Sequence, residues 1–271
     1  MLGFDEALLD EAAHHRLALR SLQATAAIWH DSASISARWQ RLLQQMPEGS
    51  IGELTPARSS NRRWLPRRVT RDGHTGQGIR ETTIGRGTIP SAFVSVVFRE
   101  LPSRWRVETR ADGDPETSVL VINGGRSWSA AYESRSGVSG PLHLPHSSFV
   151  GIHASIAAML EPDDVLRRQL QGASLDNAVW EQRQCFRLVG ATKETGDWVV
   201  WPADSYDLLL DREFGILLRF AAIVDDAVIA SAELSHLRFN AAIPDALFSA
   251  EPPSGVRWLD PEKRFAPAED L

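Results

Sequence analysis

The stretch SAFVSVVFRELPSRWRVETRADGDPETSVLVINGGRSWSAAYE, residues 91–133, decides the fold. It predicts four short β-strands, because runs rich in β-branched and aromatic residues alternate with turn residues. The separators are Leu101-Pro102, Ala111-Asp112-Gly113-Asp114 and Asn123-Gly124-Gly125. Strands joined by such short turns pair antiparallel with their neighbours, so this region predicts a β-meander.

Strand-like runs continue after one helical segment, roughly residues 149–170, in which Pro162-Asp163-Asp164 restarts the helix after a break. The later runs are WEQRQCFRLVGAT (180–192), WVVWPA (198–203), SYDLLLD (205–211), GILLRFAAIV (215–224) and AVIASAELSHLRFN (227–240). This succession predicts that the antiparallel meander extends over most of the second half of the chain.

The N-terminal region predicts two helices with a strand between them. Residues 4–19 have apolar side chains at helical spacing, residues 22–28 alternate like a strand, and residues 34–46 return to helical spacing before Pro47. Helices before and within a long antiparallel meander exclude a doubly wound fold, so the predicted class is α+β. A meander this long curls, and its concave apolar face needs cover. We therefore predict a strongly curved antiparallel sheet, an open half-barrel, covered by the helices at residues 4–19 and 149–170.

The predicted domain organisation has three parts. Residues 1–90 contribute the N-terminal helix, the first strand and a flexible insertion to the same domain, residues 91–258 form the half-barrel with a lid helix near 149–170, and residues 259–271 are a C-terminal tail. The insertion, residues 49–90, is rich in glycine and arginine. Its arginines, with Trp64 among them, are Arg58, Arg62, Arg63, Arg67, Arg68 and Arg71. Guanidinium groups pair with phosphate, so this cluster suits weak contact with an anionic membrane, although a solvated loop is the simpler interpretation.

Composition excludes several classes of protein. The chain has 271 residues, 43% of them hydrophobic, and a net charge of -6, which argues against a nucleic-acid binder. Its first residues carry acids where a signal peptide needs positive charge, and we expect a cytoplasmic protein. No apolar run approaches the roughly 20 residues that span a bilayer. The single cysteine, Cys185, excludes an internal disulfide.

Catalytic motifs are absent from the sequence. It lacks the G-x-S-x-G elbow of serine hydrolases and the GxxxxGK[ST] phosphate loop, and residues 73–78 fail the dinucleotide-binding spacing. The histidines His143, His146 and His153 begin as H-x-x-H, but Pro145 prevents the first two from lying on successive turns of one helix. We therefore predict no catalytic residue, no cofactor and no metal site.

Two segments resemble the LolA and LolB family of lipoprotein carriers. The first, VVFRELPSRWRVETRADGDPETSVLVINGGRSW (96–128), carries Pro102, Trp105, Asn123, Gly124 and Trp128. The second, LRFNAAIPDALFSAEPPSGV (237–256), carries the closing positions Phe248, Pro252, Pro253, Gly255 and Val256. The resemblance implies an open, strongly curved antiparallel sheet lidded by short helices.

These motifs also have physical roles. Asn123-Gly124 suits the positive backbone angles of a tight hairpin, and Pro252-Pro253 denies two donors to a ladder, so we expect the sheet to end there. One position departs from the family. The carriers place an arginine directly before the first Pro, where it ties the lid to the barrel, whereas this chain has Leu101 there and Arg99 two residues earlier.

The predicted function is that of a non-enzymatic protein that holds a lipid, an acyl chain or another apolar ligand. Binding would come from apolar burial, worth about 0.8 kcal/mol per methylene. The candidate wall residues are large apolar side chains on predicted strands: Val97, Leu120, Ile122, Trp128, Leu208, Leu218, Phe220 and Phe239. Two other hypotheses are a protein-interaction or regulatory module with a filled cavity and a membrane tether that acts through Arg58 to Arg71.

Overall fold

The computed structural model describes residues 2–3, 6–45, 91–100, 104–111, 117–124, 126–131, 136–141, 154–192, 201–249, 251 and 254–259. Their strands form one 13-stranded sheet in the order β1-β8-β9-β10-β11-β12-β2-β3-β4-β5-β6-β7-β13. The strands are β1 Leu2–Gly3, β2 Ser21–His30, β3 Ser91–Glu100, β4 Arg104–Ala111, β5 Thr117–Asn123, β6 Arg126–Ala131, β7 Ser136–Pro141, β8 Leu170–Trp180, β9 Arg183–Thr192, β10 Ser205–Asp211, β11 Leu217–Val224, β12 Ala227–Phe239 and β13 Arg257–Leu259. The helices are α1 Glu6–Arg16, α2 Ser32–Gln45, α3 Ala154–Leu160, the π-helix η1 Asp164–Gln169 and the 3-10 helix η2 Asp245–Phe248.

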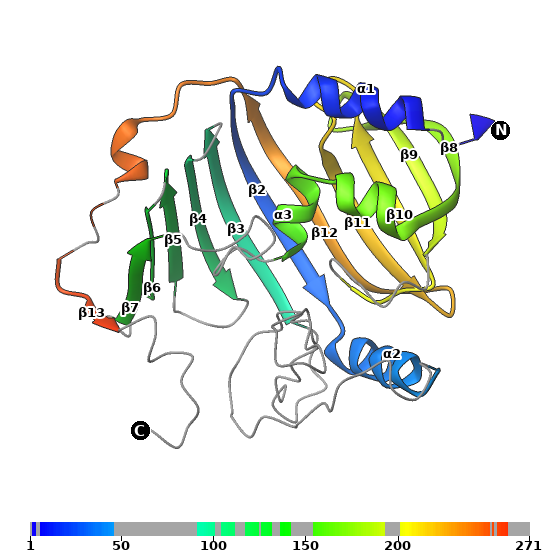
Figure 1. Ribbon diagram of the computed structural model, residues 1–271, viewed down its shortest axis with the longest axis horizontal. Helices are drawn as coiled ribbons and strands as arrows, with labels where there is room; N and C mark the ends of the chain where they lie inside the picture. Colours follow the sequence, from blue (N-terminus) through cyan, green and yellow to red (C-terminus); the bar gives the residue numbers. More distant parts are fainter. Residues whose placement is uncertain are drawn as a thin grey trace, which may run out of the picture.

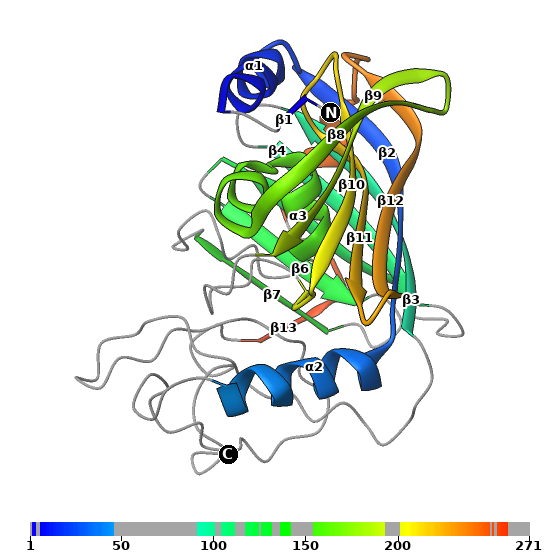
Figure 2. The ribbon, with the colours of Figure 1, turned by 90° about the vertical axis from the view of Figure 1, so that its right-hand side faces the viewer.

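Strand β2 lies at the centre of the sheet and joins two meanders, β8–β12 on one side and β3–β7 on the other (Figure 1). Its Ile28 pairs with Ala232 of β12 and with Phe93 of β3. The sheet is strongly curved, α3 lies against its concave face and α1 crosses one end (Figure 2). The prediction of an α+β fold with an open, curved antiparallel sheet covered by helices is confirmed.

Several elements differ from the prediction. The helix expected at residues 149–170 has the predicted break, since α3 ends at Leu160 and the chain resumes as η1, but the strand β8, which follows at once, was not predicted. Strand β7 was also not predicted, because SGVSGP has only one residue typical of strands, Val138, and otherwise consists of Ser, Gly and Pro. Of the strand expected at residues 198–203, the described part, Trp201–Ala203, is not a strand, and the rest lies outside the described residues.

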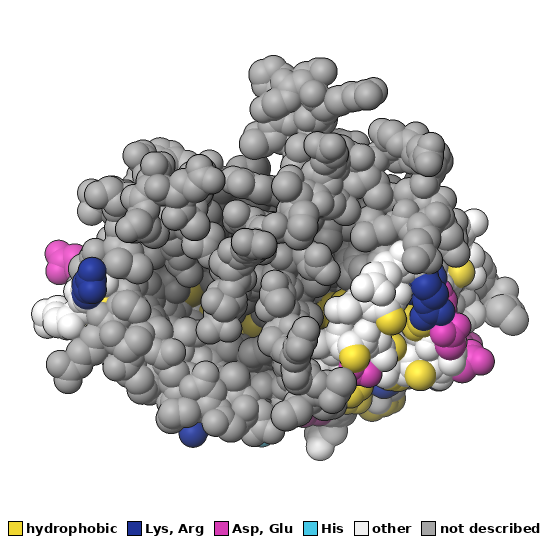
Figure 3. Space-filling view, turned by 90° about the horizontal axis from the view of Figure 1, so that it is seen from below, with side chains coloured by type: hydrophobic (Ala, Val, Ile, Leu, Met, Phe, Trp, Pro, Cys, Tyr) yellow, Lys and Arg dark blue, Asp and Glu magenta, His cyan; other side chains and the backbone are white. Residues whose placement is uncertain are grey.

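Helix α2 extends from the lower end of the sheet and is anchored there by ion pairs. Arg38 pairs with Asp204 at 2.8 Å, and Arg41 pairs with Asp225 at 3.0 Å. Acidic and basic side chains accordingly lie beside each other at this end of the molecule (Figure 3). The Asp31 carboxylate, which accepts from the Ala33 amide at 3.0 Å, caps the start of the helix.

The closing segment of the chain packs on the outer face of β4 and β5. Phe248 is fully buried, and its carbonyl accepts a 2.8 Å hydrogen bond from the Asn123 side chain. The Arg104 guanidinium lies 4.4 Å from the centre of the Phe248 ring and pairs with Asp245 at 2.6 Å. Val256 packs against a small buried cluster on the same face, separate from the main core. Helix η2 and Val256 therefore cover part of the outer face of the sheet.

Two expectations about the sheet's turns and end were wrong. The sheet does not end at Pro252-Pro253, because the chain returns as β13 and pairs parallel with β7. Asn123 does not form the hairpin loop either, since it pairs with Arg126 and leaves Gly124, at φ 59°, in the turn.

Gly215 provides a test of how α1 docks. It has φ 59°, and a β-carbon there would clash with the backbone carbonyl of Ala12 in α1. We expect Gly215→Ala to lower the free energy of unfolding by about 2 kcal/mol or more, since the methyl group adds a clash to the left-handed strain. Thermal and urea unfolding measure the loss.

Gly124→Ala is the matched control, because Gly124 has the same φ of 59° but open space around the new β-carbon. It should cost only the backbone strain, about 1 kcal/mol. Equal losses in the two variants would contradict the close packing of α1 on the β10–β11 turn.

Candidate functional site

The candidate site is the concave face of the sheet together with the lid, which we define as α3, the turn Glu161–Asp163 and η1. Cross-strand rows of apolar side chains build this face, because residues paired across an antiparallel ladder share a face. One row runs through Ala24, Val97, Val107 and Leu120. All four side chains are buried in the main core.

The structure brings most of the predicted wall residues into this one core. Six of them are at most 4% exposed: Val97, Leu120, Ile122, Leu208, Leu218 and Phe220. The side chain of Trp128 lies outside the described residues. That these residues contact a ligand stays a prediction.

Phe239 differs from the other predicted wall residues. Its ring stacks on Phe214 with 4.4 Å between centroids, and the Arg183 guanidinium lies 4.3 Å from its centre. Arg183 is itself held by Asp211 at 2.5 Å. Phe239 therefore joins the end of β12 to the β10–β11 turn, and its ring face is already occupied by protein.

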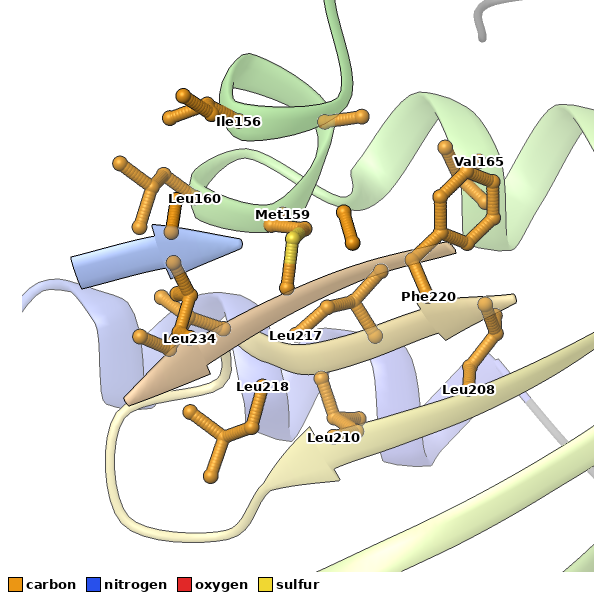
Figure 4. Packing of buried hydrophobic residues seen from close by; sticks show 14 of the residues in the cluster. Ile156, Met159, Leu160, Val165, Leu208, Leu210, Leu217, Leu218, Phe220 and Leu234 are labelled. Carbon is orange, nitrogen blue, oxygen red and sulfur yellow. The ribbon is translucent and has the colours of Figure 1, made fainter. Parts of the chain in front are cut away.

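Side chains of the lid fill the space above the β10–β12 part of the sheet (Figure 4). Ile156, Met159 and Leu160 of α3 are fully buried, as are Leu208 and Phe220 on the strands beneath them. In the described part of the chain, the lid therefore lies closed on the sheet, with its apolar side chains buried against the strands.

A hollow of about 480 Å³ opens on the rim of the barrel near residues 17–21 and 240–242. Its polar groups already bind within the protein. The Asn240 side chain accepts from the Arg20 amide at 2.7 Å and donates to the Ala18 carbonyl at 3.2 Å, and the Ser21 hydroxyl donates to the Ala241 carbonyl at 2.6 Å. This hollow therefore offers few free groups for recognition.

Arg99, near the end of β3, fastens the lid to the sheet. It is only 6% exposed, and it donates to the Leu160 carbonyl at 3.3 Å and to Glu161 Oε1 at 2.6 Å. The Leu160 carbonyl is at the C-terminus of α3, where a cation complements the helix dipole. The guanidinium of Arg99 also lies 4.5 Å from the centre of the Trp105 ring. Arg99, two positions before Leu101, thus joins β3 to the end of α3 and to the turn that follows it.

Helix α1 holds the other end of the lid. Arg16 pairs with Asp163 and donates to the Gly215 carbonyl at 2.8 Å, and Asp10 pairs with Arg167 of η1 at 2.6 Å. Burial lowers the pKa of Arg99, the Glu161 carboxylate opposes this, and the nearby positive charge of Arg16 lowers it further. The lid is therefore fixed by ion pairs at residues 161–167.

The sequence contains one signal for the role of Arg99. In the strand SAFVSVVFRE, Arg99 is two residues from Val97 and so shares its buried face. A charge on the buried face of a strand needs a partner. The partners of Arg99 lie at the end of α3 and in the turn after it, 61 and 62 residues away in sequence, and the alternation pattern does not identify them.

Other chemistry has little support in the described part of the chain. The described residues hold no group of three metal-ligating side chains, and none of their helices is long and apolar enough to cross a membrane. Cys185 is buried, which raises the pKa of its thiol. His143, His146, His153 and the six arginines from Arg58 to Arg71 lie outside the described residues.

Comparison with known proteins gives distant structural similarity. No protein-family model and no curated protein sequence matches the chain. An uncharacterized conserved protein from Thermus thermophilus is 12% identical over 94% of this chain and 98% of that one, with a TM-score of 0.47. MucB is 12% identical over 93% of this chain, which spans 64% of MucB, with a TM-score of 0.37. The chain is also similar to a LolA superfamily protein from Nitrosomonas europaea, at 12% identity over 90% of this chain and 96% of that one and a TM-score of 0.30.

The contacts of Arg99 predict that its loss loosens the lid. Arg99→Gln removes the ion pair with Glu161, and we expect faster hydrogen exchange of the α3 amides and a loss of about 1–2 kcal/mol in stability, since Glu161 is 47% exposed and becomes hydrated. Hydrogen–deuterium exchange read by mass spectrometry resolves the effect by segment.

Arg104→Gln serves as the control, because Arg104 also covers an aromatic ring and pairs with two acids, Glu100 and Asp245, but on the outer face. It should change exchange in η2 and leave α3 protected. If both variants loosened α3 alike, Arg99 would have no special role in holding the lid.

Proposed function

We propose that the protein is a non-enzymatic binding protein that holds an acyl chain or another apolar ligand on the concave face of its sheet, beneath the lid. One observation carries the proposal: a short lid packs on a continuous apolar face and is fastened to the sheet by a buried arginine. A lid that is held by hydrogen bonds and ion pairs has two discrete states, closed when these contacts are made and open when water replaces them.

The free energy of apolar burial sets the minimum length of the ligand that this site would accept. A ligand must displace the fully buried side chains of Ile156, Met159 and Leu160, each worth about 1.5–3 kcal/mol of burial. Each methylene of an entering chain returns about 0.8 kcal/mol. A chain of about ten carbons therefore balances the displaced side chains, and shorter chains bind poorly.

The filled interior also favours a second candidate, a protein-interaction or regulatory module on the same scaffold. In that case the lid never leaves the sheet, and α3 is a permanent part of the core. The two candidates differ in one measurable property, which is whether apolar molecules enter the interior of the folded protein.

Binding of neutral alcohols tests the proposal without involving charge. We expect dodecan-1-ol to bind and octan-1-ol to bind at least about tenfold more weakly, because four methylenes are worth about 3 kcal/mol. Met159→Ala should strengthen binding of dodecan-1-ol, since it weakens the packing of the lid on the sheet. Displacement of a neutral fluorescent probe measures both effects, and mass spectrometry of an organic extract identifies any ligand that co-purifies.

Val121→Ala is the matched control, because it also removes buried methyl groups, but from the outer cluster with Val119 and Val256. It should reduce stability and leave the affinity for dodecan-1-ol unchanged. No binding of either alcohol by the wild type or by Met159→Ala, with no lipid in the extract, would rule out the carrier and leave the filled module.

A further inference from the structure

Two arginines and two carboxylates meet where the lid turns from α3 into η1. Arg99 reaches this turn from β3 and Arg16 reaches it from α1, and each pairs with a carboxylate of the short segment Glu161-Pro162-Asp163. The arginine side chains are 7% and 13% exposed, whereas those of Glu161 and Asp163 are 47% and 45% exposed. The cations thus belong to the fixed body of the protein, and the anions belong to the lid.

The polar groups of this cluster are incompletely satisfied. Arg99 Nε and Asp163 Oδ1 are both buried, and neither has a hydrogen-bond partner among the described residues. A buried guanidinium donor without an acceptor is unfavourable, and an oxyanion bound beside Arg99 would supply one. Four other arginines, Arg104 among them, share this feature, so it is the meeting of Arg99 with Arg16 that distinguishes this cluster. Arg16 is close enough for its charge to lower the pKa of Arg99, so the two cations act on the same small region.

We propose that Arg16 and Arg99 form the binding site for the oxyanion headgroup of an amphiphilic ligand, and that Glu161 and Asp163 occupy this site in the closed state. The inference rests on the proposed function, because it assigns the headgroup of the ligand whose chain lies on the concave face. Guanidinium groups bind carboxylate and phosphate oxygens in a planar, often bidentate arrangement, so both headgroups fit the chemistry.

Competition between ligand and lid follows from the charges. In the closed state two cations face two anions, and the cluster is neutral. Lifting the lid without a ligand leaves two largely buried cations unpaired, which is costly. An anionic headgroup compensates the arginines as the lid carboxylates move into water, so a charged amphiphile opens the lid at lower cost than a neutral one of equal chain length.

Calorimetric titration at pH 8 with dodecanoate, dodecyl phosphate and dodecan-1-ol tests the inference. The wild type should bind at least one of the two anions about ten to a hundredfold more tightly than the alcohol, which is the range for hydrogen bonds between charged groups. The stronger of the two distinguishes a fatty-acid headgroup from a phosphate. Arg16→Gln and Arg99→Gln should each reduce the ratio of anion to alcohol affinity about tenfold or more.

Removing the lid carboxylates should raise the affinity for the anion, whereas a substitution that merely destabilised the protein would lower it. Glu161→Gln and Asp163→Asn remove the competing carboxylates and should raise the affinity for the preferred anion, whereas Arg104→Gln, on the outer face, should leave the ratio unchanged. Equal affinity for the alcohol and both anions would overturn the headgroup site and leave the proposed function intact. If none of the three compounds bound, the proposed function itself would fail.

Discussion

The pairing of β2 with strands from two distant parts of the chain is the constraint on which the rest of the structure depends. On one side β2 completes the β8–β12 meander, and on the other it begins the β3–β7 meander. Without it the two halves would each be a short sheet with an exposed apolar face. With it they form one curved surface, and curvature creates a concave side that a seven-residue helix such as α3 can cover. The lid, its ion pairs and the headgroup site all follow from that surface.

Local signals in the sequence were sufficient for the class of fold. Alternation in runs such as SYDLLLD and turn residues between them predicted antiparallel strands because those rules operate over a few residues. Strand β8 was not predicted, because its apolar residues continue the spacing of the preceding helix. Gly172, at φ 58°, also lies in a bulge that breaks the alternation of the strand. Strand β13 was not predicted, because it is three residues long and its parallel partner, β7, has a composition typical of a loop.

The candidate site was predictable only in its apolar part. Residues such as Leu208 and Phe220 are large, apolar and on strong strands, so their burial follows from pattern alone. The polar part joins β3, α1 and the lid through pairs such as Arg99–Glu161 and Arg16–Asp163, which are far apart in sequence. Ion pairs of this kind produce no hydrophobic periodicity, and a single charged residue in the sequence is normally predicted to be exposed. The alternation pattern identifies only one of these four residues as unusual, because it places Arg99 on the buried face of β3.

The central position of β2 also determines how the chain has to assemble. Arg20, beside the start of this strand, donates its amide to Asn240, which is 220 residues later and directly follows β12. Strand β3 begins at Ser91 and β12 only at Ala227, so the edge of β2 that faces β12 stays unpaired until most of the protein has been synthesised. Folds dominated by such distant pairings form slowly and expose edges that can pair with other chains. The sheet can therefore be completed only after β12, which ends at Phe239, has been synthesised, and truncated products that lack β12 would leave an edge of β2 exposed.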